Sequence, residues 1–230
     1  MSSVSVVIWT TTPWTLPANQ AVALHAELDY VVLSGEQDGE ARQLVVAEAL
    51  AEQVAERAGL DKVSMSSSFK GEVLEQLVLE HPFLERQVPV ILGEHVTIDA
   101  GTGCVHTAPG HGQDDFIVGK RYGLEVDNPV LDNGVFREDL PVVGSMHVRK
   151  ADQPVIEELQ NRGRLVALGK LHHSYPHCWR HKSPLIFRAT AQWFISMDKA
   201  GLHKRALETI EDVQWLPEWG KARIDGMMKD

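Results

Sequence analysis

Residues 101–116 read Gly-Thr-Gly-Cys-Val-His-Thr-Ala-Pro-Gly-His-Gly-Gln-Asp-Asp-Phe, and both the fold and the chemistry of this chain depend on them. Four glycines lie around His106, which predicts a tightly turned backbone that approaches a ligand closely. Asp114 and Asp115 follow at the expected start of a helix that runs to Tyr122. We expect one carboxylate to cap this helix, so the other is free to face a cavity and bind a cation such as an α-ammonium group.

A second informative stretch lies near the start of the chain, where residues 9–19 read Trp-Thr-Thr-Thr-Pro-Trp-Thr-Leu-Pro-Ala-Asn. It follows the apolar run Val4–Trp9, which predicts a buried strand. Pro13 and Pro17 exclude a regular helix or a central strand, so a braced loop is expected. Such a loop can present hydroxyls and backbone N–H groups to a carbonyl oxygen, a ribose hydroxyl or a water. Alternatively, its threonines simply favour extended backbone at a packing corner.

His106 has three interpretations: an acid/base catalyst, a structural histidine with satisfied hydrogen bonds, or the steric wall of a pocket. A general base needs an oriented partner, which the sequence does not reveal. Neither a Gly-x-Ser-x-Gly motif nor a nucleophilic cysteine motif is present, which disfavours covalent catalysis.

The remaining patterns alternate between short strands, turns and a few helices. The expected strands are Tyr30–Leu33 and Leu44–Val46, which flank a turn at Gly35–Gly39, and Val88–Ile98, followed by a hairpin at Leu131–Val135. The expected helices are Ala47–Ala58 ending at Gly59, Asp152–Arg162 ending at Gly163, Asp198–Glu211 and Pro217–Met228. Strand and loop are expected from Leu165 to Trp193.

This order predicts an α+β fold with a β-barrel-like core and peripheral helices, because strands dominate and no regular βαβ alternation occurs. Aromatic, histidine and arginine residues increase after Leu171. We therefore expect a core domain at residues 1–170 and a C-terminal part at residues 171–230.

Composition limits the possible environment and partners. The 230 residues are 43% hydrophobic, contain two cysteines and carry a net charge of −10. Two cysteines fit a reducing cytoplasm, and neither a membrane span nor a secretory leader is indicated at the start Met1-Ser2-Ser3. Since broad contact with a nucleic-acid backbone needs clustered Lys and Arg, any RNA contact should be local.

Residues 172–181, His-His-Ser-Tyr-Pro-His-Cys-Trp-Arg-His, are a candidate metal site. They lack the Cys-x-x-Cys or His-Glu-x-x-His spacing of zinc ligands, so a packed aromatic and basic segment is expected instead.

Both stretches resemble the signatures of the editing domain of isoleucyl-tRNA synthetase, and the resemblance extends over essentially the whole chain. It includes Ser174–Met197, with Arg-Ala-Thr-Ala-Gln-Trp-Phe at residues 188–194, and Leu-Pro-Glu-Trp-Gly at residues 216–220. Related valyl and leucyl domains share the Thr-Thr core and the Gly-Thr-Gly…Asp-Phe frame. The His-Ile-Gly-His and Lys-Met-Ser-Lys-Ser signatures of the synthetic site are absent, so the chain looks like an excised editing insertion.

The resemblance implies a role for each site residue. Asp115 would hold the substrate α-ammonium group and His106 would border the side-chain pocket. Trp14 would lie against the terminal adenine and Asn19 would orient the loop. The expected catalytic residues are Asp115, Thr11, Thr12 and Thr15, and the expected substrate-binding residues are Thr10, Trp14, Asn19, His106, Thr107, Ala108, Pro109 and Gly110.

The implied function is hydrolysis of mischarged Val-tRNA(Ile), and of valyl-adenylate as a second candidate substrate, by a positioned water without cofactor or metal. The expected partners are the 3′-terminal adenosine of the tRNA, the valine that is released and the remainder of the synthetase. Two alternatives stay open: a module that only binds the tRNA 3′ end, and a metal-dependent hydrolase that uses the His/Cys segment.

Overall fold

The computed structural model describes residues 4–172 and 174–229, and the chain divides into two compact units, Met1–Ala189 and Thr190–Asp230. The strands are β1 (Val4–Val6), β2 (Ala21–Leu24), β3 (Asp29–Gln37), β4 (Glu40–Ala47), β5 (Asp61–Met65), β6 (Phe69–Lys70), β7 (Val78–Glu80), β8 (Gln87–Leu92) and β9 (Val105–Thr107). The α-helices are α1 (Ala51–Ala58), α2 (Gln113–Arg121), α3 (Asp152–Asn161), α4 (Leu202–Asp212) and α5 (Trp219–Lys229). The 3-10 helices are η1 (Pro13–Ala18), η2 (Glu48–Leu50), η3 (Gly71–Leu74), η4 (Val148–Lys150) and η5 (Lys199–Gly201).

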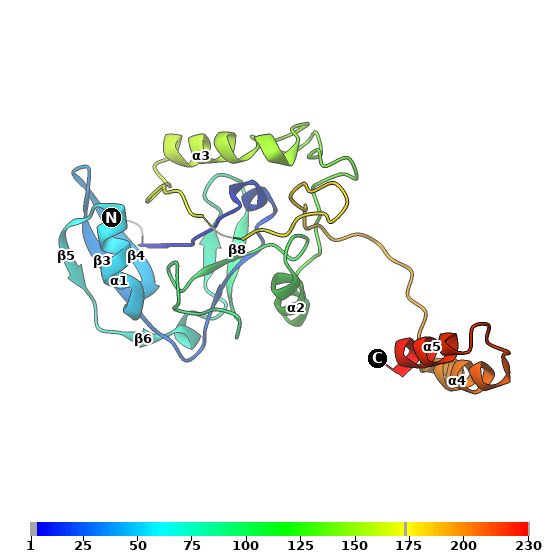
Figure 1. The fold of residues 1–230 in the computed structure, drawn as a ribbon. Helices are drawn as coiled ribbons and strands as arrows, with labels where there is room; N and C mark the ends of the chain where they lie inside the picture. Colours follow the sequence, from blue (N-terminus) through cyan, green and yellow to red (C-terminus); the bar gives the residue numbers. More distant parts are fainter. Residues whose placement is uncertain (1–3, 173, 230) are drawn as a thin grey trace. The chain divides into compact units, whose positions relative to one another are not determined.

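The first sheet has the strand order β1-β4-β3-β5, and β6 also pairs with β3 (Figure 1). Strands β3 and β4 form a long antiparallel hairpin whose pairing continues to Gln37 and Glu40, so the turn is only Asp38–Gly39. The expected turn at Gly35–Gly39 is therefore too long. Helix α1 covers the face of this hairpin that carries Val31, Leu33 and Val46.

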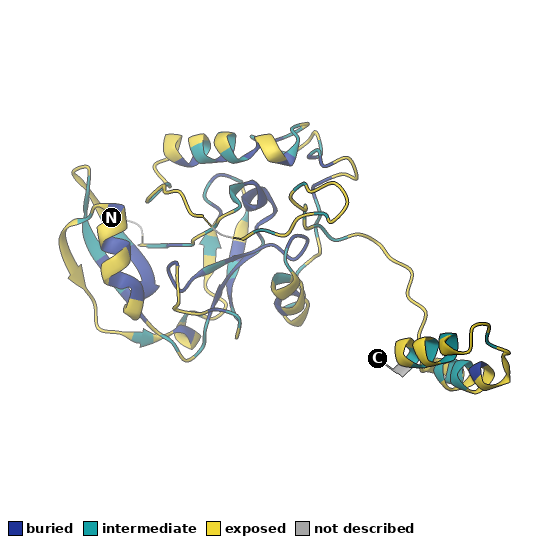
Figure 2. Ribbon diagram, viewed as in Figure 1, coloured by how far each residue is buried: buried dark blue, intermediate teal, exposed yellow. Residues whose placement is uncertain are grey.

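The second sheet has the order β7-β8-β2-β9 and holds the strands that border the site. Strand β2 pairs in parallel with β8 and antiparallel with β9, which places Val22 opposite His106. A shared apolar core contains side chains of both sheets, among them Leu24 of β2, Val45 of β4 and Val90 of β8. Figure 2 shows this buried interior between exposed outer faces. The α+β class with a barrel-like strand core is confirmed.

The threonine segment is more regular than expected, because its second half forms the 3-10 helix η1. Pro13 occupies the first turn, where its missing N–H costs nothing. Trp14 and Leu16 of η1 enter a buried cluster with Phe136 and with Val155 of α3. This packing fixes η1 against α3, which lies beside it in Figure 1.

Several other expected boundaries shift. Strand β1 ends at Val6 and is not buried, since Val4 is 54% exposed; helix α1 begins at Ala51 and strand β8 ends at Leu92. The expected hairpin near Gly134 is present as one bridge between Val130 and Phe136. Between Leu165 and Trp193 the described residues form only the bridge His177–Pro184 and no strand. Helices α4 and α5 begin a few residues later than expected.

Along the chain, the boundary between the two compact units lies between Ala189 and Thr190. The sequence predicts a division after residue 170, which stays a prediction. Residues before the boundary at Ala189 pack within the first unit. The Ala189 N–H donates to the Gly110 carbonyl, and Arg188 Nη1 donates to the Val130 carbonyl. Within residues 4–172 and 174–229, no helix is both long and apolar enough to cross a membrane.

Candidate active site

The two informative stretches meet at a cavity of about 300 Å³ in the first unit. The threonine loop forms one wall, and β9 with the start of α2 forms the other. The lining residues are Trp9, Thr10, Thr11, Thr12, Thr15, Val105, His106, Ala108, His111 and Asp115. Seven of the residues predicted for the site therefore come together here.

Hydroxyl groups of the loop follow one another along the cavity wall. The Thr10 hydroxyl accepts a hydrogen bond from the Thr12 backbone N–H at 3.0 Å, which bends the chain so that both hydroxyls lie 3.5 Å apart. The Thr15 hydroxyl donates to the Thr12 carbonyl at 2.9 Å. In the described part of the chain the Thr11 hydroxyl has no partner, so it is free to bind a ligand.

The His106 ring is held in one tautomer. The Asn19 side-chain nitrogen donates to the Ala21 carbonyl at 2.8 Å, which fixes the orientation of the amide. The same nitrogen donates to His106 Nδ1 at 2.7 Å. Because Nδ1 accepts, the proton of the neutral ring resides on Nε2. Nε2 then donates to the Thr15 hydroxyl at 3.0 Å, whose own proton is directed to Thr12.

This arrangement decides among the interpretations of His106. Burial is the largest of the effects that lower the pKa of the His106 ring to about 3, and the neighbouring His81 and His111 act in the same direction. The ring is therefore neutral, and its one lone pair is already occupied by Asn19. His106 is a satisfied histidine that forms a wall of the cavity, with no free lone pair to take a proton from water.

Asp115 supplies the carboxylate of the site. Its Oδ2 accepts a hydrogen bond from the Ala108 backbone N–H at 2.9 Å, while Oδ1 bonds to none of the described residues. Burial raises the pKa of this carboxyl above its ordinary value, and the Ala108 hydrogen bond opposes that shift. Gly112 allows this placement, because a Cβ there would lie 2.8 Å from Asp115 Cγ.

The expected cap of helix α2 is wrong. The residue at the N-cap position is Gly112, and no side chain hydrogen-bonds to the first turn in place of a cap. Asp114 is exposed and Asp115 bonds outside the helix, so both contribute to α2 only through their charge near its N-terminus.

Trp14, which is expected to lie against an adenine, does not face the candidate cavity. Its ring is 9% exposed, packs edge-on against His111 and Phe136, and does not line the cavity. The aromatic residue at the cavity is Trp9, which is 42% exposed and lies on the Gly101 backbone, where a Cβ would be 2.9 Å from the ring. Its position directly before the threonines is the signal that sequence reasoning missed.

Four more predicted residues support the cavity from outside its lining. Asn19 holds His106, and Thr107 is fully buried with its hydroxyl directed at the Val105 carbonyl. Pro109 packs against Gly119 of α2, and Gly110 lies so close to the Asp127 carbonyl that a Cβ would be 2.2 Å away. None of these four residues lines the cavity, and their part in binding a substrate stays a prediction.

His111 lines the cavity although its role was not assigned from the sequence. Its Nδ1 donates to the Phe187 carbonyl at 2.9 Å, which attaches the backbone at Phe187 to the site. Burial is the main cause that lowers the pKa of His111, so this ring is neutral as well.

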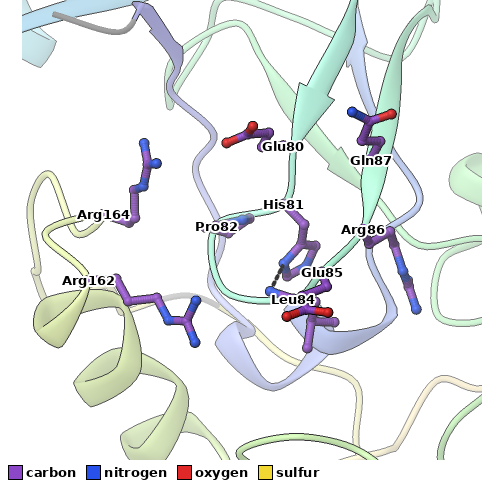
Figure 3. Close-up of a pocket in the computed structure, with 9 residues that line it drawn as sticks. All are labelled: Glu80, His81, Pro82, Leu84, Glu85, Arg86, Gln87, Arg162 and Arg164. Carbon is purple, nitrogen blue, oxygen red and sulfur yellow. Dashed lines mark hydrogen bonds between the residues drawn. The ribbon is translucent and has the colours of Figure 1, made fainter.

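A larger cavity of about 590 Å³ opens between the β7–β8 hairpin and the C-terminal end of α3 (Figure 3). Its charged lining residues are Glu80, Glu85, Arg86, Arg162 and Arg164. None of the predicted site residues lines it, and its lining carries both carboxylate and guanidinium groups. The smaller threonine cavity is therefore the candidate site.

The candidate metal segment does not gather a ligand set among the described residues, where no three His, Cys, Asp or Glu side chains converge. Cys178 Sγ lies 3.3 Å from His181 Nδ1, and His177 Nδ1 donates to the Tyr175 carbonyl. His173 lies outside the described residues.

The chain belongs to the leucyl-tRNA synthetase editing domain family, whose model matches residues 2–146. Over its whole length it is similar to isoleucine--tRNA ligases. It is 68% identical over 229 residues to the enzyme of Alcanivorax borkumensis and 55% identical over 228 residues to that of Shewanella sediminis, covering 100% and 99% of this chain. The chain spans 24% of the length of each of these relatives.

Solved structures show the same fold at low sequence identity. A leucyl-tRNA synthetase CP1 structure, GlLeuRS-CP1, is 15% identical, with a TM-score of 0.57 over 73% of this chain and 84% of that chain. The P. falciparum cytosolic leucyl-tRNA synthetase editing domain is 11% identical, with a TM-score of 0.52 over 68% of this chain and 77% of that chain.

The neutral histidines predict a loss of stability in acid. Burial is also the main cause that lowers the pKa of His81, to about 4. Because these rings ionise near 6.5 when unfolded, the unfolded chain binds more protons as the pH falls below 6.5, and the free energy of unfolding should drop. One such histidine contributes on the order of 2 kcal/mol of loss at pH 5.

Urea unfolding at pH 7 and pH 5 measures this loss, and His81→Asn should show a smaller difference than the native chain. The raised pKa of Asp115 acts in the opposite direction, because its carboxyl takes up a proton in the folded chain at a higher pH than in the unfolded chain. Equal stability of the native chain at pH 7 and pH 5 would contradict the neutral assignments.

Proposed function

We propose that this chain is a hydrolytic proofreading site that cleaves the aminoacyl ester of Val-tRNA(Ile). One observation supports the proposal above all: Asp115, whose Oδ1 has no partner among the described residues, lines the same small cavity as the threonine hydroxyls. An aminoacyl ester presents an ammonium group beside a carbonyl and a ribose hydroxyl. A carboxylate opposite several hydroxyls complements that combination.

In this proposal Asp115 binds the α-ammonium group, and the free Thr11 hydroxyl with Thr10 and Thr12 binds the ester and the terminal ribose. Trp9 provides the exposed aromatic face beside them, on which the terminal adenine stacks. Thr15 acts through the loop, since its hydroxyl is already bonded to Thr12 and His106.

Water is the nucleophile and is positioned by the threonine hydroxyls together with the ribose hydroxyl of the substrate. The oxygen of water bonds to the ester carbonyl carbon, and the ester bond to the ribose oxygen breaks. The proton of water passes to that ribose oxygen, so valine and the free tRNA 3′ end are released. His106 takes no proton in this sequence because its lone pair is occupied.

The need for such a site follows from a physical limit. A hydrophobic synthetic pocket rejects an amino acid that lacks one methylene by only about 1–3 kcal/mol, and the isoleucyl enzyme is itself the established example of this limit. A second cavity that admits valine and excludes isoleucine by size removes the residual errors. The wall formed by His106 belongs to that exclusion.

The net charge of −10 supports a local contact with the tRNA end only. The remainder of the synthetase would supply most of the affinity for tRNA, since the chain spans 24% of its curated relatives.

Release of labelled valine from Val-tRNA(Ile) by this chain tests the proposal. We expect release well above the rate without protein, undiminished by EDTA, and no comparable release of isoleucine from Ile-tRNA(Ile). Loss of activity on chelation would favour the metal-dependent alternative. Binding of the tRNA end without release would favour the module that only binds.

A further inference from the structure

We propose that Arg86 is a positioning residue of this editing site, which acts through Asn19 to hold His106 and the threonine loop in their working arrangement. The inference rests on the proposed function. It starts from the C-terminal end of η1, where the loop leaves the cavity wall and enters strand β2.

Backbone carbonyls at the end of η1 can accept hydrogen bonds from donors outside the helix, and the Leu16 carbonyl does so in addition to accepting from the Asn19 N–H. Two side chains of the β7–β8 hairpin supply these donors: His81 Nε2 donates to the Leu16 carbonyl at 3.0 Å and Arg86 Nη1 donates to the Asn19 carbonyl at 2.8 Å. A cation at a helix C-terminus is favourable because the carbonyl ends carry partial negative charge. The hairpin thus holds the loop through side chains that do not line the threonine cavity.

The Asn19–Gln20 peptide transmits this contact to β9. Its carbonyl accepts from Arg86, while its Gln20 N–H donates to the Thr107 carbonyl at 2.9 Å. Because both bonds belong to one peptide group, each polarises the other. The peptide therefore fastens the loop to the residue that follows His106.

The Asn19 side chain provides the second route. It donates to His106 Nδ1 at 2.7 Å, and His106 Nε2 donates to the Thr15 hydroxyl at 3.0 Å. Arg86 thus holds the backbone of Asn19, and hydrogen bonds lead from the side chain of the same residue through His106 into the threonine loop. If Asn19 were displaced, the Nδ1 lone pair of His106 would lose its donor. The His106 ring would then no longer be held in one orientation.

The position of Arg86 makes it separable from the other arginines of its cavity. In Figure 3 its guanidinium extends away from Arg162 and Arg164. Within the described residues Arg86 forms no ion pair, whereas Arg162 pairs with Glu158. Its contact with Asn19 therefore does not compete with a neighbouring carboxylate.

The test compares Arg86→Met, Arg86→Lys and, as the matched control, Arg164→Met, which removes one positive charge from the same cavity. Nitrogen-15 NMR of the histidine rings reports the His106 tautomer directly, and a purely structural role would leave it unchanged. We expect Arg86→Met to lose the pure Nε2–H pattern of His106. We also expect a three- to tenfold lower kcat for valine release with a smaller change in KM. Arg86→Lys should restore much of both readings, and Arg164→Met should alter neither.

An unchanged His106 spectrum and unchanged kcat in folded Arg86→Met would overturn the proposal. If that variant does not fold, Arg86→Gln, which keeps a shorter donor, is read in the same way. A native chain that releases no valine would reject the proposed function alone, because the effect of Arg86 on the His106 tautomer is measured without substrate.

Discussion

Asp115→Asn is expected to lower kcat/KM for valine release from Val-tRNA(Ile) by about ten- to a hundredfold. The substitution keeps the shape of the side chain and its hydrogen bond to the Ala108 N–H, and it removes only the charge. A hydrogen bond to a charged group contributes about 1.5–3 kcal/mol, which corresponds to the expected range of rates. The measurement is labelled-valine release at substrate concentrations below KM.

The chain offers a matched control one residue away. Asp114→Asn removes the same charge from the first turn of α2, but Asp114 is exposed and does not line the cavity. Both variants lose the same interaction with the helix dipole, so a rate difference between them reports the cavity alone. We expect Asp114→Asn to hydrolyse valine at close to the native rate.

A substrate without an ammonium group separates binding of charge from other effects. The ester of 2-hydroxyisovaleric acid with the tRNA end keeps the valine side chain and replaces the ammonium by a hydroxyl. Asp115→Asn should slow release of this acid far less than release of valine. Equal losses on both substrates would assign Asp115 to positioning of the loop instead.

Although Asp115→Asn should lower activity, it should leave the stability of the folded chain unchanged or raise it. Burial raises the pKa of Asp115, so the folded state disfavours its charged form. Asp115→Asn removes that cost and should unfold at an equal or higher urea concentration at pH 7. An inactive and less stable variant would contradict this electrostatic explanation.

Features that depend on neighbouring residues could be predicted from the sequence. The ends of α1, α2 and α3 lie at glycines with positive φ, Gly59, Gly123 and Gly163, because the left-handed conformation favours a residue without Cβ. The meeting of the threonine loop with residues 105–115 was expected from the resemblance, which assigns residues of both stretches to one site.

Features that depend on distant residues could not be predicted in this way. The resemblance implies that Trp14 lies against the terminal adenine, but its ring is buried in a cluster, most of whose residues lie more than a hundred positions later, from Val130 to Leu159. The predicted side-chain cap of α2 was wrong for a related reason, because Asp115 accepts a hydrogen bond from the Ala108 N–H and none from the helix. Arg86 has no local signal at all, since 67 residues separate it from Asn19.

His106→Ala is expected to let the domain release isoleucine from correctly charged Ile-tRNA(Ile), with a smaller effect on valine. The ring forms part of the cavity wall, and bonds at both nitrogens to Asn19 and Thr15 prevent it from turning away. A rigid wall discriminates by a steric clash, which is not limited to the about 1–3 kcal/mol that one methylene contributes through attraction. The ratio of valine to isoleucine release should fall at least tenfold.

Loss of the ring also leaves the Asn19 amide and the Thr15 hydroxyl with one partner fewer, so some loss of stability is expected. His81→Asn provides the control for this effect. His81 is another buried neutral histidine that bonds to the same loop, at the Leu16 carbonyl, but it does not line the threonine cavity. It should lower stability without changing the ratio of valine to isoleucine release.

A smaller change at the same position makes the test independent of folding. His106→Asn shortens the side chain but retains polar atoms toward Asn19 and Thr15, so it should keep more stability than His106→Ala while still enlarging the cavity. Parallel assays with labelled valine and labelled isoleucine then decide the role. If both folded variants still spare isoleucine while they hydrolyse valine normally, the size limit of the cavity lies elsewhere on its wall.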